Sequence, residues 1–414
     1  MTQTPPTSAD RRVSLGLLFG ALCLIAVNMR TPITGIGPLL EQISASTGRP
    51  LPVLSLLTSV PVISWAVVSS VAHPLTRRFG TRRVVLWALV LLVAGTIVRS
   101  LPGAAAEVEL WLGTGVIGVT LALLNVLMPA VVKRSFGSRV PAVTSIYTAL
   151  LAGCGAVASS LVVPVSYVVS GGEGSAGWRV ALVAMIATLP IAIALWAWHM
   201  RQAGPDEREA RRAPDAPPRA PRRSVWGDRT AWLVGLYMGA QSTLFYAMLT
   251  WTAPYARSLG RSELTAGNDV MILQIIGVIG SLVLPFLMRG ALARWMPSII
   301  PVVGTIGIVG LMIAPQGIVV WLMIQGLYTG SSLAISLTLM ATRARDHRTA
   351  SALSGMAQSV GYVISGAAPL IFGAILTATG GWEWAFGYVL VALAAQLVLG
   401  LFVGRERHVF DGPP

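Results

Sequence analysis

Charged residues are scarce in this chain. Asp, Glu, Lys and Arg make up 11% of its 414 residues, whereas soluble domains average about 25%. Hydrophobic residues supply 54% of the chain, and the mean hydropathy is +0.72. This composition excludes an ordinary soluble domain and indicates a protein that lies mostly in lipid.

Residues that commonly carry out chemistry are also few. The two cysteines, Cys23 and Cys154, both lie inside apolar runs, where we expect them to pack as small core residues. The four histidines fall at the ends of such runs, and the sequence contains no phosphate loop, metal-ligand cluster or nucleophile elbow. We therefore expect no enzyme activity, no cofactor, no metal site and no ATP-driven transport.

Apolar runs of about 20 residues recur along the whole chain, and each is long enough to cross a bilayer. Each run is expected to form a helix, because lipid cannot bond to free backbone groups and a helix bonds its own. The sequence therefore predicts an all-α membrane protein with twelve transmembrane helices, at about 14–40, 52–72, 84–101, 110–132, 141–168, 178–200, 230–256, 266–288, 295–314, 317–341, 350–377 and 383–403.

The net charge of +14 raises the question of nucleic-acid binding, but the position of the basic residues gives a simpler explanation. If both termini are cytoplasmic, 24 of the 30 Lys and Arg residues fall on the cytoplasmic side. This asymmetry follows the positive-inside rule and supports an even number of spans. We expect a multi-pass, monomeric protein of the cytoplasmic membrane with lipid and a small solute as partners and no nucleic acid. Arg99, near an outer helix end, is expected to extend to the surface.

A charged, proline-rich segment divides the chain. Its composition cannot pack a core, so it indicates a flexible cytoplasmic linker between two sets of six spans. The expected organisation is an N-terminal tail, a first bundle, the linker, a second bundle and a C-terminal tail, at 1–13, 14–200, 201–228, 229–403 and 404–414.

The two halves repeat each other weakly. Trp178 follows a glycine at the start of the sixth span, as Trp382 does at the start of the twelfth. Pro38 in the first span matches Pro254 in the seventh, and counting back from these prolines places Tyr246 opposite Arg30. Such repeats predict two pseudo-symmetric six-helix bundles with a substrate site between them near mid-membrane.

Arg30 is the most informative residue, because it is a charge in the middle of the first apolar run. Burying it costs about 3 kcal/mol or more, so such a residue usually faces a partner or a water-filled cavity. Pro32 removes one backbone hydrogen bond beside it and predicts an interrupted helix. The pattern favours an anion site, although Arg30 could instead bond carbonyls exposed by the proline. Asn28 lies about 200° around the helix, so both side chains face one cavity only if Pro32 distorts the backbone.

Further polar residues lie at membrane depth and are candidates to bind the solute. They are Asn28, Asn125, Tyr147, Gln241, Tyr246, Gln358 and Tyr362, with Gln274 and Gln325 as further amides. The alternative is that the amides join helices, and that Trp65 and Trp251 pack rather than stack on a solute. The acidic residues nearest the spans, among them Glu41 and Asp269, lie toward the outer ends, so we expect no carboxylate switch at mid-membrane.

The loop between the second and third spans, Pro74 to Arg83, carries a small residue, arginines, a glycine and a basic pair. It resembles the loop motif of the major facilitator superfamily, except that Arg77 stands where that family has an acidic residue. The resemblance implies a gating role for the loop residues, and the alternative is an ordinary positive-inside loop. The residues concerned are Arg77, Arg78, Gly80, Arg82 and Arg83.

Four segments narrow the resemblance to the cyanate and 2-nitroimidazole permease family. They are 28–40, 125–136, 239–246 and 353–362. The resemblance implies secondary transport of a small anion or compact polar solute by alternating access. Efflux of drugs or toxic compounds and, more remotely, a membrane sensor built on a transporter scaffold remain as alternatives.

Overall fold

The protein is described by a computed structural model that covers residues 8–102, 106–171, 174–202, 224–288, 290–345 and 347–411. Within these ranges all regular structure is helical. The first bundle, as far as it is described, contains α1 (Ser8–Thr34), α2 (Ile36–Thr47), α3 (Leu51–Leu54), α4 (Leu56–Phe79), α5 (Thr81–Arg99), α6 (Ala106–Ser135), α7 (Val140–Ser170), α8 (Ala176–Ala184) and α9 (Leu189–Gln202).

The second bundle follows after the short 3-10 turn Val225–Gly227. Its described helices are α10 (Arg229–Ser258), α11 (Glu263–Leu287), α12 (Met296–Ile313), α13 (Ile318–Thr342), α14 (His347–Thr379) and α15 (Trp382–Val403). Further 3-10 turns lie at Gly137–Arg139, Gly290–Leu292 and Pro315–Gly317. Three spans are interrupted, because α1 continues as α2, α3 as α4, and α8 as α9.

The all-α membrane fold is confirmed, and its helices coincide with the predicted spans. Among the described residues, eleven helices or helix pairs are long and apolar enough to cross a membrane. The remaining span is α10, which is interior: most of its residues from Val234 to Ala256 are buried. A helix surrounded by other helices needs no lipid-facing apolar surface, so α10 can carry more Thr, Ser, Tyr and Gln than its neighbours.

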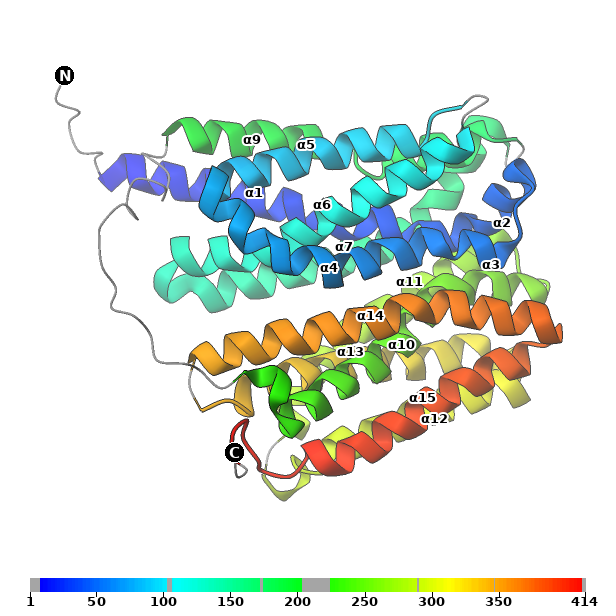
Figure 1. Cartoon of the computed structure of the whole chain (residues 1–414). Coiled ribbons are helices and arrows are strands. Elements are labelled where there is room, and N and C mark those ends of the chain that lie inside the picture. Colours follow the sequence, from blue (N-terminus) through cyan, green and yellow to red (C-terminus); the bar gives the residue numbers. More distant parts are fainter. Residues whose placement is uncertain are drawn as a thin grey trace.

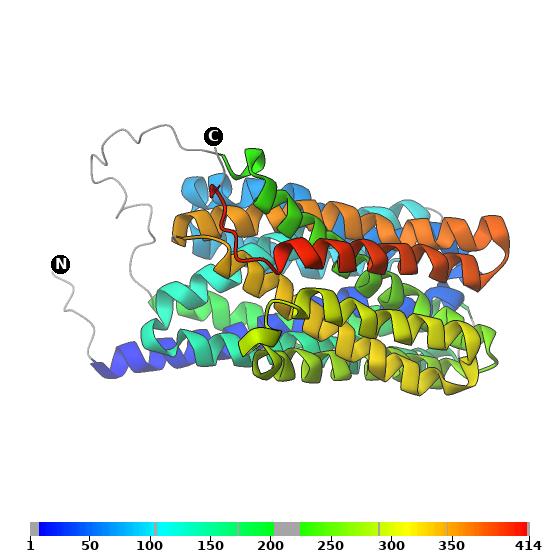
Figure 2. The same cartoon turned by 90° about the horizontal axis from the view of Figure 1, so that it is seen from below.

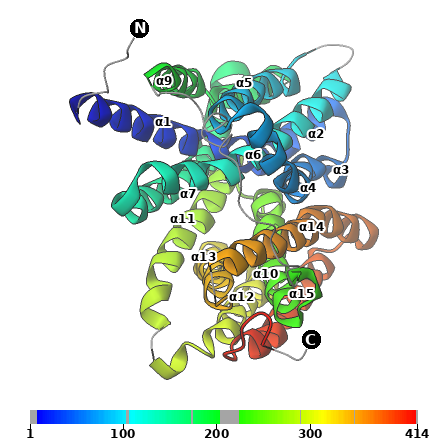
Figure 3. The same ribbon diagram turned by 60° about the vertical axis from the view of Figure 1, so that its left-hand side comes forward.

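The helices form two bundles that lie side by side. Figure 1 shows the first bundle, from blue to green, above the second, from light green to red, and Figure 3 shows the same division obliquely. The start of α1, the end of α9, the start of α10 and the end of α15 lie at one end of the molecule, on the left in Figures 1 and 2. We call this the tail end, and we call the opposite end, where α2 and α3 lie, the distal end.

The bundles pack closely at the distal end. There α2 packs against α10, α3 and the adjoining part of α4 against α14, and α7 against α11. A Cβ atom on Gly37 of α2 would lie 2.6 Å from the carbonyl oxygen of Leu249 in α10, so the two backbones nearly touch. Toward the tail end α4 and α14 diverge (Figure 1).

The chain segments at the tail end differ in part from the predicted tails and linker. Helix α1 already begins at Ser8. Residues 203–223 of the predicted linker lie outside the described part of the chain. Residues 404–411, expected to be a tail, lie against the second bundle: Val409 donates to the carbonyl of Arg343, and Phe410 donates to the Asp228 carboxylate before α10. We call this segment the C-terminal clasp.

Candidate functional site

The first span is interrupted at one residue, Gly35, between α1 and α2. Pro32 lies inside α1 three residues earlier and has no N–H to give to the carbonyl of Asn28. Glycine lowers the local helix propensity further. The predicted interruption is therefore present, and Arg30 lies immediately on its tail side.

Among the described residues, three hydrogen bonds join the interrupted segment to α5 and to the residues between α8 and α9. The amide of Asn28 donates to the Thr188 hydroxyl at 2.8 Å, and the Thr31 hydroxyl donates to the carbonyl of Met185 at 3.2 Å. Met185 and Thr188 belong to the interruption between α8 and α9. Asn28 is fully buried and directed into the first bundle, so the structure does not place it beside Arg30.

The third bond comes from Arg99, which donates to the carbonyl of Pro32 at 3.0 Å. The prediction that Arg99 extends to the surface is wrong, because its side chain is only 1% exposed. The exposed carbonyl of the interrupted helix offers an acceptor inside the bundle, and the long side chain reaches it instead of water.

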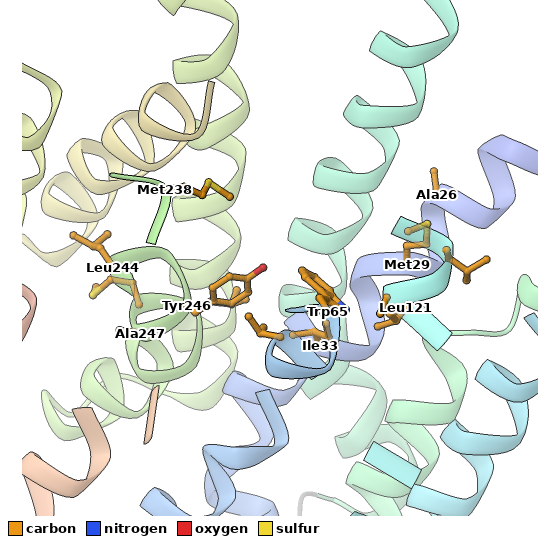
Figure 4. Packing of buried hydrophobic residues seen from close by; sticks show 14 of the residues in the cluster. Ala26, Met29, Ile33, Trp65, Leu121, Met238, Leu244, Tyr246 and Ala247 are labelled. Carbon is orange, nitrogen blue, oxygen red and sulfur yellow. The ribbon is translucent and has the colours of Figure 1, made fainter. Parts of the chain in front are cut away.

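Arg30 is directed the other way, toward the second bundle. The residue is half-buried, and its guanidinium donates to the Tyr246 hydroxyl at 3.4 Å. Its Cζ atom lies over the ring of Trp65, 5.4 Å from the ring centroid. Tyr147 and Tyr362 lie close enough to interact with its charge. The bond between Arg30 and Tyr246 confirms the sequence prediction that these two residues lie opposite each other. Figure 4 shows Tyr246 of α10 reaching across to Trp65 of α4.

Aromatic rings form one wall of this site. Trp65 makes edge-on contacts with Tyr362 and Tyr246, at centroid distances of 5.2 and 6.3 Å. Tyr362 donates to the Gln358 side chain at 3.5 Å, so Tyr362 lies between that amide and Trp65. Edge-to-face contacts stabilise such clusters by about 0.5–1.5 kcal/mol per pair, which holds the rings in fixed orientations.

The opposite wall comes from α7 and α11. A Cβ atom on Gly155 would lie 3.0 Å from Cβ of Arg30 and 3.4 Å from the Gln274 side-chain oxygen. A larger residue here would crowd Arg30, so glycine favours this close approach of α7. The Gln274 amide donates to the Ser159 hydroxyl at 3.2 Å and so joins the bundles beside Arg30.

Several other candidates lie elsewhere. Gln241 is buried in α10 and donates to Ser242 and to the sulfur of Met238. Asn125 is half-buried in α6, with no described bond to Arg30. Trp251 packs in the second bundle against Phe372, Trp382 and the carbonyl of Pro369.

Tyr147 lies at the edge of the site, in α7. Its hydroxyl donates to the sulfur of Met29 at 3.0 Å, and the side chain is 8% exposed. A thioether is a weak acceptor, so this hydroxyl could exchange that bond for a stronger acceptor on a solute.

The carboxylates that pair between or beside the spans lie at the distal end, and Asp228 and Asp411 lie at the tail end, so both groups are away from Arg30. Glu41 pairs with Arg257 across the bundles at 3.0 Å, and Asp269 forms two hydrogen bonds with Arg261 at 2.7 and 2.9 Å. No carboxylate pairs with Arg30 among the described residues. An Arg beside rings and hydroxyls without a counter-charge can bind a planar or anionic solute.

The predicted gating loop connects α4 and α5 at the tail end. Gly80 ends α4 with φ of 87°, a conformation that favours glycine. Arg78 lies over the ring of Phe79 at 5.2 Å, and the carbonyl of Arg82 accepts a bond from the Trp196 indole. Arg83 is exposed, and the side chain of Arg77 lies outside the described residues. A gating role for this loop stays a prediction.

Sequence reasoning did not assign roles to Gly155, Ser159 and Arg99 at this site. Glycines and serines are common in packed membrane helices, so their type alone gives no signal. Arg99 offered one signal, its charge close to an apolar run, but its inward direction depends on the carbonyl that Pro32 of another helix presents.

Comparisons with known proteins give the wider context. The profile of the Major Facilitator Superfamily matches residues 18–368. The chain is 31% identical to the 2-nitroimidazole transporter of Escherichia coli (strain K12), over 99% of this chain and 100% of that protein. It is 28% identical to the cyanate transport protein CynX of the same organism, over 88% and 92% of the two chains.

A solved structure agrees in fold. A bacterial homolog of the human lysosomal transporter Spinster, in an inward-facing and unoccupied conformation, superimposes with a TM-score of 0.77 at 14% identity, covering 97% of this chain and 98% of that one. The predicted resemblance and fold are thus confirmed, and the protein is a multi-pass membrane transporter of a small solute. The chain belongs to the Major Facilitator Superfamily.

Proposed function

We propose that this transporter carries a small planar solute that is anionic or bears an electron-rich polar group, and that Arg30 binds it. The observation that carries the proposal is the Arg30 guanidinium between the bundles, 3.4 Å from a tyrosine hydroxyl and over the Trp65 ring. Its planar fork fits a nitro, carboxylate or cyanate group, and the rings fit a flat body.

The relatives support this class of solute. Nitroimidazole is a flat ring with a polar substituent, and cyanate is a small anion; both appear in the names of relatives that match most of this chain. The two solutes share the ability to accept hydrogen bonds from a guanidinium in one plane. A site with one cation and several rings accommodates both.

The arrangement of the bundles supports alternating access. We place the tail end in the cytoplasm, because most basic residues lie there and the positive-inside rule favours that orientation. Described polar contacts between the bundles lie at or beyond the depth of Arg30 on the distal side: Arg30–Tyr246, Gln274–Ser159, Ser160–Asn268, Thr58–Thr250, Gln42–Glu263 and Glu41–Arg257. In that orientation the contacts close the outer path and the conformation is inward-facing, and we infer that transport requires these contacts to break in turn.

Counterflow in proteoliposomes tests the proposal. Vesicles loaded with unlabelled 2-nitroimidazole or cyanate should accumulate the labelled solute only when they contain the protein. Arg30→Gln should lower the apparent affinity about 100-fold, because a charge-assisted hydrogen bond contributes about 1.5–3 kcal/mol. Arg257→Gln, a change of an interface arginine at the distal end, is the matched control and should keep affinity.

Two results would contradict the proposal. One is wild-type affinity in a folded Arg30→Gln protein, which would make Arg30 structural. The other is an equal loss in Arg257→Gln, which would trace the effect to interface charge in general rather than to the site.

A further inference from the structure

Arg99 is an unusual residue to find inside the first bundle. It lies in the last turn of α5, is 1% exposed, and bonds to Pro32 through one terminal nitrogen. Its Nε and second terminal nitrogen have no partner among the described residues. A buried, half-satisfied cation is unfavourable, and an apolar side chain of similar volume would ordinarily be more stable there. Bundle packing therefore does not explain the residue.

The bond that Arg99 does make is directed at the interruption of α1. Helix α5 packs chiefly against α6 and α9, so the Arg99 side chain reaches across to join it to α1. Pro32, whose carbonyl it holds, lies two residues from Arg30, which is about 200° around a helix. The bond to Pro32 therefore holds the helix on the side opposite to the Arg30 side chain.

The other attachments of the interrupted segment lie to the same side. Asn28 and Thr31 bond to the residues between α8 and α9. Of the described bonds that join this segment to the rest of the first bundle, the one from Arg99 alone carries a full charge. A charge-assisted bond is about twice as strong as a neutral one, so it dominates the orientation of a segment that lacks a regular backbone bond.

We propose that Arg99 is a positioning residue for the substrate site. By holding the Pro32 carbonyl, it sets the rotation of α1 at its interruption and so directs the Arg30 guanidinium toward Trp65 and Tyr246. It does not touch the solute. The expected effect of Arg99 on solute binding rests on the proposed function. Its effect on the orientation of Arg30 does not depend on which solute is carried.

The geometric content is tested without substrate. In a background with Cys23→Ala and Cys154→Ala, Arg30→Cys reports the orientation of position 30 through its modification rate by the anionic reagent 2-sulfonatoethyl methanethiosulfonate, measured by mass spectrometry on the purified full chain. Adding Arg99→Met, which cannot donate a bond, should change the rate by about fivefold or more, whereas Arg99→Lys should stay within about twofold. Arg179→Met, a change of another buried arginine in the same bundle, should leave the rate unchanged.

The functional content is tested with a double-mutant cycle for 2-nitroimidazole binding. Arg99→Met should weaken binding about tenfold in the wild-type background and less than twofold when Arg30→Gln is already present, because it acts through Arg30. Arg99→Lys should restore most of the affinity. If Arg99→Met does not fold, Arg99→Gln, a shorter and neutral donor, replaces it with the same expected direction.

The outcomes separate the two proposals. An unchanged modification rate at position 30 in a folded Arg99→Met or Arg99→Gln protein overturns the positioning role, even if the protein transports. So does an equal change in Arg179→Met, which would indicate general loosening of the bundle. A changed rate without any 2-nitroimidazole or cyanate binding upholds the positioning role and contradicts the proposed substrate class.

Discussion

The first helices of the two bundles occupy matched positions but differ in construction. In the first bundle α1 and α2 are separated at Gly35 and carry Arg30, whereas α10 runs unbroken for 30 residues and carries Tyr246. The two matched helices meet: Arg30 bonds to Tyr246, and Glu41 bonds to Arg257, each across 216 positions of sequence. Positions that are equivalent in the two bundles therefore contact each other, and the two residues of each pair have different side-chain chemistry.

The position of proline explains the different continuity. Pro32 lies near the middle of the first span, with Gly35 after it, so the lost bond is followed by a residue of low helix propensity. Pro254 lies close to the distal end of α10 at Ser258, where little helix remains to be redirected. The comparison indicates that Arg30 lies on a helix that can bend at its interruption, whereas Tyr246 lies on a continuous helix.

Exchanging the two residues gives the largest expected effect. Arg30→Tyr alone should lower the affinity for 2-nitroimidazole about 100-fold, whereas Arg30→Tyr with Tyr246→Arg should recover about tenfold of that, because one guanidinium still faces one phenol. Binding is measured by thermal shift and counterflow. Full recovery would show that the interrupted helix is not needed, and no recovery would show that the charge acts only from α1.

Gly37→Ala should disturb the distal contact between the same two helices. The added methyl would lie 2.6 Å from the Leu249 carbonyl oxygen, and such overpacking costs about 1–3 kcal/mol, which shifts the closed-to-open equilibrium about tenfold. Spin labels at Ala45→Cys and Leu259→Cys should report longer distances. Gly153→Ala, where an added methyl meets nothing within 4 Å, is the control. An unchanged distance would mean that α2 and α10 adjust without opening.

Tyr246→Phe should have a smaller effect. The bond from Arg30 is long, 3.4 Å, so its loss should cost about 0.5–1 kcal/mol, a two- to fivefold loss of affinity, while the ring contact with Trp65 remains. Tyr255→Phe, whose hydroxyl bonds to Leu311 within the second bundle, should leave affinity unaltered. A loss as large as that of Arg30→Gln would instead show that the Tyr246 hydroxyl binds the solute directly.

The smallest expected effect concerns the C-terminal clasp, which ties the start of α10 at the tail end. The backbone N–H of His408, with Arg345 nearby, lowers the pKa of Asp411 below its ordinary value. The clasp is therefore stabilised above the unfolded-state pKa, and this contribution is lost as pH falls through the lower folded-state value. The protection of residues 404–411 from hydrogen exchange, relative to the intrinsic exchange rate at the same pH, should fall only in acid, and Asp411→Asn should show the lower protection at neutral pH. Equal protection in both proteins at neutral pH would show that Asp411 does not stabilise the clasp.

Local pattern predicted the helices well, because lipid leaves the backbone few alternatives. The apolar runs located the spans within a few residues, and Pro32 predicted the interruption near Arg30. Proline spacing also predicted that Arg30 faces Tyr246, because equivalent residues in two repeats keep the same offset from matched prolines. These predictions needed only chain-local chemistry and symmetry.

The direction of individual polar side chains could not be predicted in the same way. Asn28 and Gln241 were candidates for the site, yet Asn28 bonds to Thr188 and Gln241 to Ser242. Arg99 was expected at the surface and is buried. Each outcome depends on acceptors presented by other residues, and polarity at membrane depth is common to both structural and binding roles.

The sequence by itself determined that this chain spans a membrane in two related sets of helices, and that one isolated arginine marks their centre. Hydropathy and charge are properties of residue type, so they can be read along the chain. Only the tertiary structure decided that Trp65 lies under Arg30, that α7 approaches Arg30 at Gly155, and that Arg99 bonds to the carbonyl of Pro32. Those relations depend on which faces of separate helices meet, and close packing, not residue type, fixes that choice.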